Sequence, residues 1–379
     1  MNLSHWEFKT WFSNIDFAVI GSGIVGLSCA LELRRKYPNS KIAVFERGML
    51  PSGASTKNAG FACFGSLSEI LEDLKTHSEA EVLQLVKNRV EGLRLLRNTL
   101  GDTQLDYKQY GGYELFSKED AELFETCKLR IESVNQLLKP IFGAEIFSVK
   151  ENHFGFKNIQ PKLIYSSFEG QIDTGKMMLN LINKASKENI LILNSAEVTA
   201  IADEGKSVFL KINSTEARQK GPIDLRVKKV FIATNGFAKQ FLQEDVQPAR
   251  AQVLVTKPID NLKIKGTFHL DRGYYYFRNI ENRLLFGGGR NLDFKTEETT
   301  EMDLTQLVQN KLEELLKTVI LPSQKFDIDH RWSGIMGVGG QKKPIVKAVS
   351  ENVFCGVRLG GMGVAIGSSI GKQLADLTN

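Results

Sequence analysis

A hexapeptide near the amino terminus carries the strongest chemical signal in this 379-residue chain. It follows the GxGxxG pattern and reads Gly21, Ser22, Gly23, Ile24, Val25, Gly26. In such a pattern Gly21 allows a tight turn, Gly23 lets a pyrophosphate approach the backbone, and Gly26 lets a helix pack on a strand. The helix that follows would present free N–H groups to the anion. This spacing therefore predicts a dinucleotide-binding turn.

A carboxylate stands where a dinucleotide site holds its ribose. Glu46 ends the apolar segment "KIAVFE", twenty residues after Gly26. It can accept hydrogen bonds from both ribose hydroxyls and would repel a 2′-phosphate, which disfavours NADP. These residues by themselves do not separate FAD from NAD.

The elements around the turn form a βαβ unit. "IDFAVI" and "KIAVFE" are apolar strands, and between them Ile24, Leu27 and Leu31 share one face of a helix. Such a unit implies a parallel sheet with a right-handed crossover. Farther along, "AQVLVTKP", "GTFHLD", "GYYYFRN" and "RLLFGGGRN" indicate a second, β-rich region.

We therefore expect an α/β fold with two interleaved domains. One is a Rossmann-like domain with a parallel sheet, and the other is an α+β domain built on a mostly antiparallel sheet. We assign residues 1–75, 165–245 and 330–379 to the Rossmann-like domain. The second domain takes residues 76–164 and 246–329.

Composition argues against several other classes of protein. Lys and Arg number 49 and Asp and Glu 44, giving a net charge of +5, and they are dispersed, which gives nucleic-acid binding little support. The four cysteines show no CxxC spacing and the five histidines are scattered, so we expect no metal site and a cytoplasmic protein with reduced thiols. No apolar run reaches transmembrane length. The aromatic N-terminal segment could touch a membrane surface, but we favour a short helix packed on the body.

Several dispersed motifs, taken in order, resemble the D-amino-acid oxidase (DAO) superfamily of FAD-dependent oxidoreductases, which includes glycine and sarcosine oxidases. After the GxGxxG turn and Glu46 come "GASTKNAG", "GQIDTGKMMLNL", "AEVTAI", "VFIATNGFAKQFL" and "RLGGMGVAIGSSIGKQLADL". The resemblance covers the FAD-binding parts across most of the chain and is poor in the substrate domain. It implies FAD, held without a covalent bond, as the cofactor.

The resemblance also implies a set of cofactor-binding residues. Glu46 would hold the adenosine ribose, Arg47 would lie near the adenine, and Val198 would meet the adenine through its backbone. Backbone N–H groups of residues 360–364 would stabilise negative charge on the reduced ring. The full set is Gly21, Ser22, Gly23, Ile24, Val25, Gly26, Glu46, Arg47, Ser55, Thr56, Lys57, Asn58, Ala59, Gly60, Val198, Thr234, Asn235, Gly236, Gly334, Arg358, Gly360, Gly361, Met362, Gly363 and Val364.

The activity that the resemblance implies is oxidation of the CH–NH bond of a small amine or amino acid. A hydride would pass from the carbon beside a neutral amine to flavin N5, the imine would hydrolyse, and oxygen or another acceptor would take the electrons. The alternatives are a dehydrogenase that passes electrons to a quinone or another acceptor, an oxidase of another CH–NH or CH–OH donor, and a protein that holds FAD without turnover. A nicotinamide-binding enzyme with a coincidental glycine-rich tail is a fourth.

Three residues are candidates for catalysis or substrate binding. In "GYYYFR", a strand would place Tyr274 and Tyr276 on one face and Tyr275 on the other, and the resemblance puts Tyr275 nearest the substrate, within one residue. Arg278 could pair with a substrate carboxylate, and Lys57 could act electrostatically beside the flavin. The alternatives are a core strand for Tyr275, a surface arginine at a turn for Arg278, and a solvated loop lysine for Lys57.

One departure from the family pattern bears on the substrate. Members acting on simple amino acids often carry an arginine before the final strand, where this chain has Met336 and Gly337. This disfavours glycine or a plain D-amino acid. The W-x-G spelling of Trp332 and Gly334 is closer to relatives that oxidise amines such as γ-glutamylputrescine. No cysteine lies in this piece, and Cys355 falls in a predicted buried strand, so we expect no covalent flavin.

Overall fold

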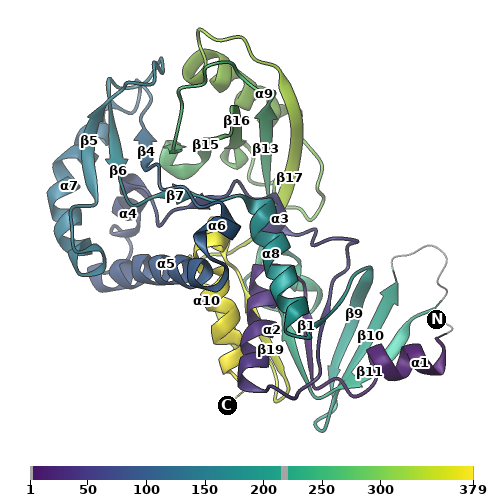
Figure 1. The fold of residues 1–379 in the computed structure, drawn as a ribbon. Helices are drawn as coiled ribbons and strands as arrows, with labels where there is room; N and C mark the ends of the chain where they lie inside the picture. The colour runs from purple at the N-terminus through teal and green to yellow at the C-terminus, as the bar shows by residue number, and fades with distance from the viewer. Residues whose placement is uncertain (1–2, 215–220, 379) are drawn as a thin grey trace.

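The computed structural model describes residues 3–214 and 221–378 and has a mixed α/β fold with parallel and antiparallel sheets (Figure 1). Its first large sheet has six strands, in the spatial order β18 (Ile345–Ala348), β19 (Val353–Val357), β12 (Lys229–Ile232), β1 (Phe17–Ile20), β2 (Ile42–Phe45) and β8 (Leu191–Leu193). Neighbouring strands are parallel except β18, which runs antiparallel to β19. The strands β1, β2 and β19 are buried along their whole length, as expected for a parallel sheet covered on both faces.

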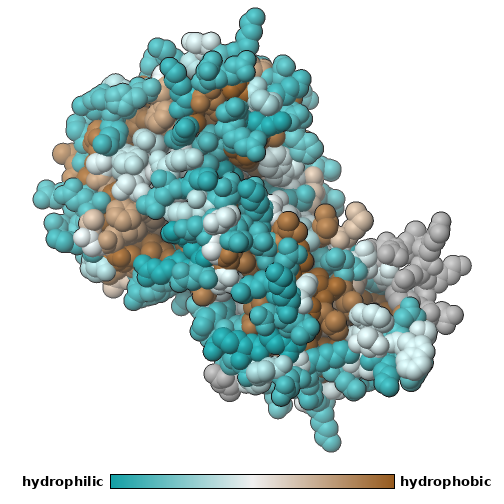
Figure 2. Space-filling model, in the orientation of Figure 1, coloured by the Kyte–Doolittle hydropathy of each residue, from teal (hydrophilic) through white to brown (hydrophobic). Residues whose placement is uncertain are grey.

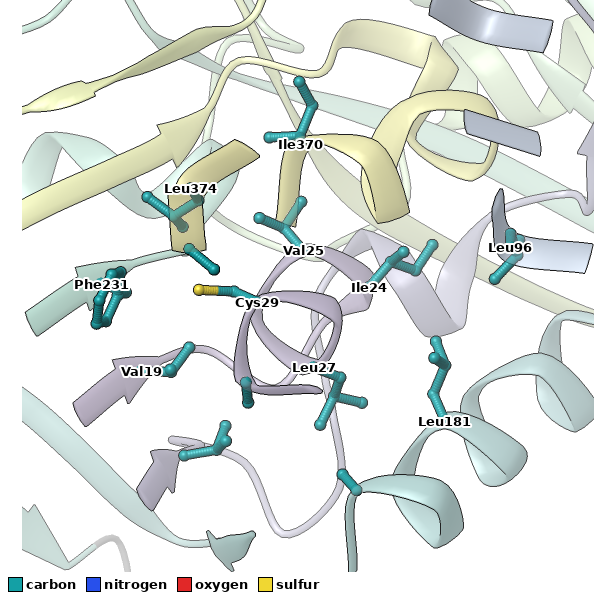
Figure 3. Close-up of a cluster of buried hydrophobic side chains, with 14 of the residues drawn as sticks. Val19, Ile24, Val25, Leu27, Cys29, Leu96, Leu181, Phe231, Ile370 and Leu374 are labelled. Atoms are coloured by element: carbon teal, nitrogen blue, oxygen red, sulfur yellow. The ribbon is translucent and has the colours of Figure 1, made fainter. Parts of the chain in front are cut away.

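Helices cover one face of this six-stranded sheet. They are α2 (Ile24–Lys36), α8 (Thr174–Lys187) and α10 (Gly363–Asp376), and Figure 3 shows the apolar side chains that α2 contributes between α10 and the strands. The helices α2 and α10 can approach closely because Gly371 has no side chain. A Cβ at this position would lie only 2.5 Å from the Val25 carbonyl oxygen. This close packing places the N-terminal ends of both helices at the same region of the molecule.

The other face of the six-stranded sheet packs on a small antiparallel sheet. That sheet consists of β9 (Ala196–Asp203), β10 (Val208–Ser214) and β11 (Ile223–Val227). Residues 223–232 contribute to both sheets, because only one residue, Lys228, separates the end of β11 at Val227 from the start of β12 at Lys229. The result is a layered half of the molecule: helices, parallel sheet, antiparallel sheet.

The second large sheet has eight strands. Their order is β17 (Ile328–Val338), β13 (Gln247–Thr256), β16 (Arg283–Gly288), β15 (Tyr275–Ile280), β14 (Thr267–Leu270), β4 (Gly112–Leu115), β6 (Lys162–Ser166) and β5 (Phe147–Glu151). All neighbours are antiparallel except β14 and β4. One face carries Phe268, Phe277 and Phe286 in a core under α9 (Gln306–Leu315). Because side chains alternate along a strand, the residues between these phenylalanines, such as His269 and Tyr276, point to the opposite face of the sheet.

The remaining elements connect and cover these sheets. α4 (Leu67–Asp73), α5 (Glu79–Leu100) and α7 (Ala121–Phe142) share a core with the β4, β6 and β5 end of the eight-stranded sheet. α3 (Ala54–Lys57), the two-stranded sheet of β3 (Phe61–Ala62) and β7 (Gly170–Gln171), and α6 (Asp102–Leu105) lie between the two large sheets. α5 also packs on α10, where a Cβ at Gly92 would lie 2.1 Å from the Ala365 carbonyl oxygen.

The N-terminal segment is only partly packed on the body. α1 (His5–Glu7) continues into a turn of π-helix at Phe8–Phe12. Leu3 and Phe12 pack against the core between the six- and three-stranded sheets, whereas Trp6 is 71% exposed. Figure 2 shows a mostly hydrophilic face with separate hydrophobic patches. Within the described residues, no helix combines the length and apolarity needed to cross a membrane.

The division into two domains stays a proposal, and the sheets refine its boundaries. All six strands of the first sheet fall in the segments assigned to the Rossmann-like domain. The boundaries at 165 and 330 fall inside β6 and β17, both of which belong to the eight-stranded sheet. We therefore propose that the second domain extends through Ser166 and through Val338, because cutting a strand would divide its hydrogen-bonded ladder.

Candidate functional site

A long cavity brings most of the predicted cofactor residues together. It lies between the carboxyl ends of β1, β2 and β12 and the face of the eight-stranded sheet opposite α9. Ligands of open α/β sheets bind in such a crevice, where the chain leaves a central strand toward opposite sides. The predicted residues that line it are Gly21, Gly23, Ile24, Val25, Glu46, Arg47, Ser55, Lys57, Asn58, Ala59, Gly60, Val198, Thr234, Asn235, Gly334, Gly360, Gly361, Met362, Gly363 and Val364.

The three glycines of the fingerprint have separate structural reasons. Gly21 has a φ of +99°, a conformation that side chains rarely adopt, and its Cβ would meet the Ala233 carbonyl oxygen at 2.9 Å. A Cβ at Gly23 would lie 2.8 Å from Ser55 Oγ, and one at Gly26 only 1.9 Å from the Gly21 carbonyl oxygen. The backbone therefore turns tightly, and α2 begins against it with no side chain between them.

Glu46 is buried at the cavity wall and organises the turn. Its Oε2 accepts hydrogen bonds from the backbone N–H of Ser22 at 3.1 Å and from Ser22 Oγ at 2.8 Å, and its Oε1 accepts from Gly48 N at 2.9 Å. Ser52 Oγ also donates to Oε1 at 3.4 Å, the longest of the four hydrogen bonds, and this is the one that a ribose hydroxyl would replace. Beside it the Arg47 guanidinium stacks on the Phe237 ring, 3.7 Å from the centroid, and both residues line the cavity.

The loop from Gly53 to Gly60 is shaped by its own polar side chains. Ser55 Oγ accepts from the N–H of Ile24 at 3.0 Å, which ties the loop to the start of α2. Asn58 donates to the carbonyls of Ala54 and Ser55, and its Oδ1 accepts from Gly60 N at 2.9 Å. The predicted cofactor ligands Ser55 and Asn58 therefore line the cavity while also holding the loop in place.

Lys57 lies where the loop touches β17. Trp332 Nε1 donates to the Lys57 carbonyl at 2.9 Å, and a Cβ at Gly334 would lie 2.9 Å from Lys57 Cβ. Ile335 and Met336 of the same strand also line the cavity. Trp332 and Gly334 thus let the loop pack flat on β17, a role that the W-x-G spelling alone did not suggest.

Hydrogen bonds connect the C-terminal glycine-rich turn to a residue shortly after the end of β12. Asn235, with a φ of +44°, accepts hydrogen bonds on Oδ1 from Arg358 N at 3.1 Å and from Leu359 N at 3.2 Å. α10 then begins with no side-chain cap on its N–H groups. Thr234 Oγ1 is buried, lines the cavity and has no hydrogen-bond partner in the described protein.

Five predicted cofactor residues lie behind the cavity wall rather than on it. They are Ser22, Gly26, Thr56, Gly236 and Arg358. Thr56 Oγ1 donates to the Pro51 carbonyl at 2.7 Å, and Arg358 donates to Asp245 Oδ2 at 3.1 Å and to the Lys343 carbonyl at 3.0 Å. These side chains support the turns that form the wall.

The strand β15 presents Tyr276, and not Tyr275, to the cavity. Tyr275 packs with the core beneath α9 and is 6% exposed. Burial raises the pKa of Tyr276 to about 12, so its hydroxyl keeps its proton at neutral pH. The resemblance to the family located the substrate-facing tyrosine only to within one residue. Side chains alternate along β15, so only one of the two tyrosines can face the cavity, and it is Tyr276.

Arg278 is placed as a structural anchor. Its side chain is 5% exposed and does not line the cavity. It donates to the carbonyls of Ala59, of Ile172 at 2.9 Å and of Asn279 at 3.2 Å. Burial lowers its pKa to about 10, which leaves it charged at neutral pH. Three of its five N–H donors bind backbone carbonyls, and the residue is buried off the cavity lining, so Arg278 is neither a surface arginine nor oriented for a substrate carboxylate.

Sequence reasoning missed the residues that close the other end of the cavity. Phe61, on β3, has its ring centroid 5.3 Å from that of His269 and 5.7 Å from that of Tyr276. No local motif marks these positions, and only the strand register, which pairs His269 with Tyr276, brings them together. The missed residues of this end are Phe61, Cys63, Glu69, Val253, His269, Gly273 and Tyr276. The described residues contain no cluster of metal ligands.

Comparison with known proteins identifies the family. Residues 16–377 match the model of the FAD dependent oxidoreductase family, DAO, so the chain belongs to that family. A probable oxidoreductase, OrdL, from Haemophilus influenzae is 21% identical, over 97% of this chain and 83% of its own length. This chain is accordingly an FAD-dependent oxidoreductase, and its cofactor is FAD rather than a nicotinamide.

Solved structures share the fold at low sequence identity. Glycine oxidase from Geobacillus kaustophilus superimposes with a TM-score of 0.75 and 19% identity, over 96% of this chain and 94% of that one. L-proline dehydrogenase from P. horikoshii gives 0.73 and 17%, over 97% and 93%. Iminodiacetate oxidase from a Chelativorans species gives 0.72 and 18%, over 96% and 95%. The predicted fold class is confirmed.

The cavity fits FAD on the chain's own features. The glycine turn lets an anion approach the backbone at the N-terminus of α2, where Gly23 supplies no side-chain cap. Thr234 Oγ1, which also lines the cavity, has no hydrogen-bond partner among the described residues and could bind the cofactor. Glu46 and Arg47 line the cavity beside the glycine turn, where they would hold the adenosine, and α10 begins elsewhere on the wall without a side-chain cap on its N–H groups.

Proposed function

We propose that this FAD-dependent oxidoreductase oxidises the CH–NH bond of a small amine or amino acid. The observation that carries the proposal is one continuous cavity, which runs from the dinucleotide turn to an aromatic pocket at Phe61 and Tyr276. When bound, FAD would supply the chemistry by accepting a hydride from the carbon beside the amine nitrogen. The imine product would then hydrolyse in water.

The residues of the chain have positioning roles in this proposal. Phe61, Val253 and Tyr276 would exclude water from the reacting carbon and orient it, which favours reaction by fixing a productive geometry. Lys57 would contribute positive charge beside the reacting groups. Three structures of similar fold are named for glycine, L-proline and iminodiacetate, molecules in which a nitrogen adjoins an oxidisable carbon.

We also propose that FAD is held without a covalent bond. Cys355 is fully buried in the strand β19, away from the cavity. Cys63 does line the cavity, but burial raises the pKa of its thiol well above the usual value, which leaves it a poor nucleophile. All four cysteines are buried free thiols, which supports a cytoplasmic location as part of the same proposal.

Anaerobic flavin bleaching tests the proposal directly. Purified holoenzyme is mixed with a panel of amines, D-amino acids, L-amino acids and N-methyl amino acids, and its flavin absorbance is followed. We expect at least one small amine to bleach the flavin. If no compound of the panel does so, the proposed reaction is wrong. Hydrogen peroxide release on admission of air would identify oxygen as an acceptor, and bleaching without peroxide would point to a dehydrogenase.

A further inference from the structure

One asparagine shortly after β12 has a backbone conformation that only glycine adopts freely. Asn235 begins the short 3₁₀-helix Asn235–Gln240 with a φ of +44°, and it lines the cavity. A left-handed conformation is unfavourable for an L-residue, although asparagine tolerates it better than most. Such a residue persists only where surrounding contacts hold it, and it is found most often at functional sites.

The contacts that hold Asn235 are hydrogen bonds to the segment before the C-terminal glycine-rich turn. Its Oδ1 accepts from Arg358 N at 3.1 Å and from Leu359 N at 3.2 Å. Arg358 also has a left-handed conformation, with a φ of +65°, so backbone strain is present at both ends of this contact. Because β19 ends at Val357, these two N–H groups lie beyond the strand, and Asn235 supplies their acceptor.

The eight-stranded sheet reaches the same asparagine through β17. A Cβ at Gly337 of this strand would lie 2.6 Å from Asn235 Oδ1, and one at Gly236 would lie 2.6 Å from the Met336 carbonyl oxygen. The strand therefore contacts Asn235 with no side chain between them. Figure 1 shows β17 in the upper half of the molecule and β19 in the lower half, so Asn235 lies where the two large sheets meet.

The tip of the glycine-rich turn has little packing of its own. Gly360 and Gly361 line the cavity, and a Cβ at either position would meet nothing within 4 Å among the described residues. The Arg358 guanidinium is bound to Asp245 Oδ2 at 3.1 Å, which anchors that side chain off the cavity lining. The backbone at the start of the turn is left to Asn235, so the position of the tip depends on this side chain.

We infer that Asn235 is a positioning residue for FAD, which fixes the glycine-rich turn of residues 360–364 relative to β12 and so shapes the cavity wall that retains the cofactor. Asn235 acts through the turn and through its two backbone N–H groups. The packing of Gly337 on the same side chain makes the position of β17 part of this arrangement. The inference concerns the cofactor alone and goes beyond the proposed reaction, on which it does not depend.

A glycine at position 235 separates the side chain from the backbone strain. Asn235→Gly suits the left-handed conformation and deletes both hydrogen bonds, so a loss of function reflects the missing side chain. FAD released on dilution of the holoenzyme is measured by its fluorescence, and we expect the dissociation constant to rise about tenfold or more. The visible spectrum of the bound flavin should shift. In hydrogen–deuterium exchange, peptides spanning residues 353–364 should exchange faster than in the wild type.

Two further variants show whether the hydrogen bonds carry the effect. Asn235→Asp keeps an acceptor at the same position, so exchange in residues 353–364 should stay slow and the dissociation constant of FAD should stay within about threefold of the wild type. Asn261→Gly is the matched control, because Asn261 has a φ of +56°, is exposed and does not line the cavity. It should retain FAD as the wild type does.

A change in β17 tests the same contact with Asn235 left in place, and it decides the matter if Asn235→Gly does not fold. Gly337→Ala puts a methyl group 2.6 Å from Asn235 Oδ1, so the side chain must move. We expect weaker FAD binding and faster exchange in residues 353–364. Gly340→Ala, in the loop after β17, meets only the Asp245 carboxylate, at 3.4 Å, and should leave both unchanged.

The outcomes separate this inference from the proposed function. Wild-type FAD affinity and flavin spectrum in Asn235→Gly would overturn the role of Asn235, even if that variant melted at a lower temperature. Loss of FAD in Asn235→Asp equal to that in Asn235→Gly would also overturn it, because the acceptor is kept. Failure of the amine panel to bleach the flavin would count against the reaction alone, whatever these variants do.

Discussion

The two large sheets build the cavity in different ways. The six-stranded sheet contributes backbone: the turn at Gly21 and Gly23, and the helix starts of α2 and α10. The eight-stranded sheet contributes side chains, among them Val253, His269 and Tyr276, from three different strands. Backbone recognition suits a cofactor whose phosphates are always the same, whereas side chains on a sheet face can change without disturbing the ladder beneath them.

The two sheets also differ in how completely other elements cover their faces. The parallel sheet is covered on both faces, by helices on one side and by the three-stranded sheet on the other. The eight-stranded sheet packs one face into an aromatic core beneath α9. Its other face packs against α4, α5 and α7 at the β5 and β6 end and borders the cavity elsewhere. Substitutions in the first sheet should therefore affect folding and cofactor retention together, while those on the cavity face of the second should affect the substrate.

The largest effect should follow a change in the backbone cradle. Gly26→Ala places a Cβ 1.9 Å from the Gly21 carbonyl oxygen, so either the turn or α2 must move. We expect FAD to be lost and the free energy of unfolding to fall by about 3 kcal/mol. Flavin-to-protein absorbance after gel filtration and denaturant unfolding measure the two effects.

A helical glycine outside the cavity provides the control for this change. Gly175 is exposed in the first turn of α8, and the nearest neighbour of an added Cβ would be the Asp173 carboxylate at 3.3 Å. Gly175→Ala should retain FAD and shift stability by no more than about 1 kcal/mol. Full flavin retention in Gly26→Ala would contradict the assigned role of the turn.

An intermediate effect is expected where the two halves meet. Arg278→Met leaves the carbonyls of Ala59 and Ile172 without a donor and loosens the loop between them and the sheet. We expect a loss of about 2–4 kcal/mol in the free energy of unfolding. Arg226→Met, which breaks an exposed pair with Glu204, should cost less than about 1 kcal/mol. If Arg278→Met were fully stable and only weakened substrate binding, the arginine would be a substrate ligand after all.

The smallest effect separates the two faces of one strand. Tyr276→Phe removes a hydroxyl at the cavity, and we expect a change of about two- to tenfold in the rate of anaerobic flavin reduction at limiting substrate. Tyr275→Phe changes a residue of the core under α9 and should leave that rate unaltered. The reverse pattern would mean that Tyr275 faces the substrate, as the sequence comparison first suggested.

Prediction from sequence succeeded where the signal is local. The turn, Glu46 and the C-terminal glycines line one cavity, and the sequence pointed to them because each lies within a few residues of a recognisable strand or helix end. Domain boundaries carry no such local signal, since β6 and β17 join the eight-stranded sheet through partners distant in the chain. The amino-acid sequence of residues 328–338 does not indicate which sheet this strand will join.

The amino-acid sequence by itself determined the family, the cofactor and the glycine cradle, because glycines act through the backbone geometry of their own turn. Only the tertiary structure decided that Tyr276 faces the cavity, that Arg278 anchors three carbonyls, and that His269 meets Glu169, 100 residues away in the chain. The physical reason is strand register. Register is determined by the packing of whole sheets, and a shift of one residue would exchange the cavity face for the core.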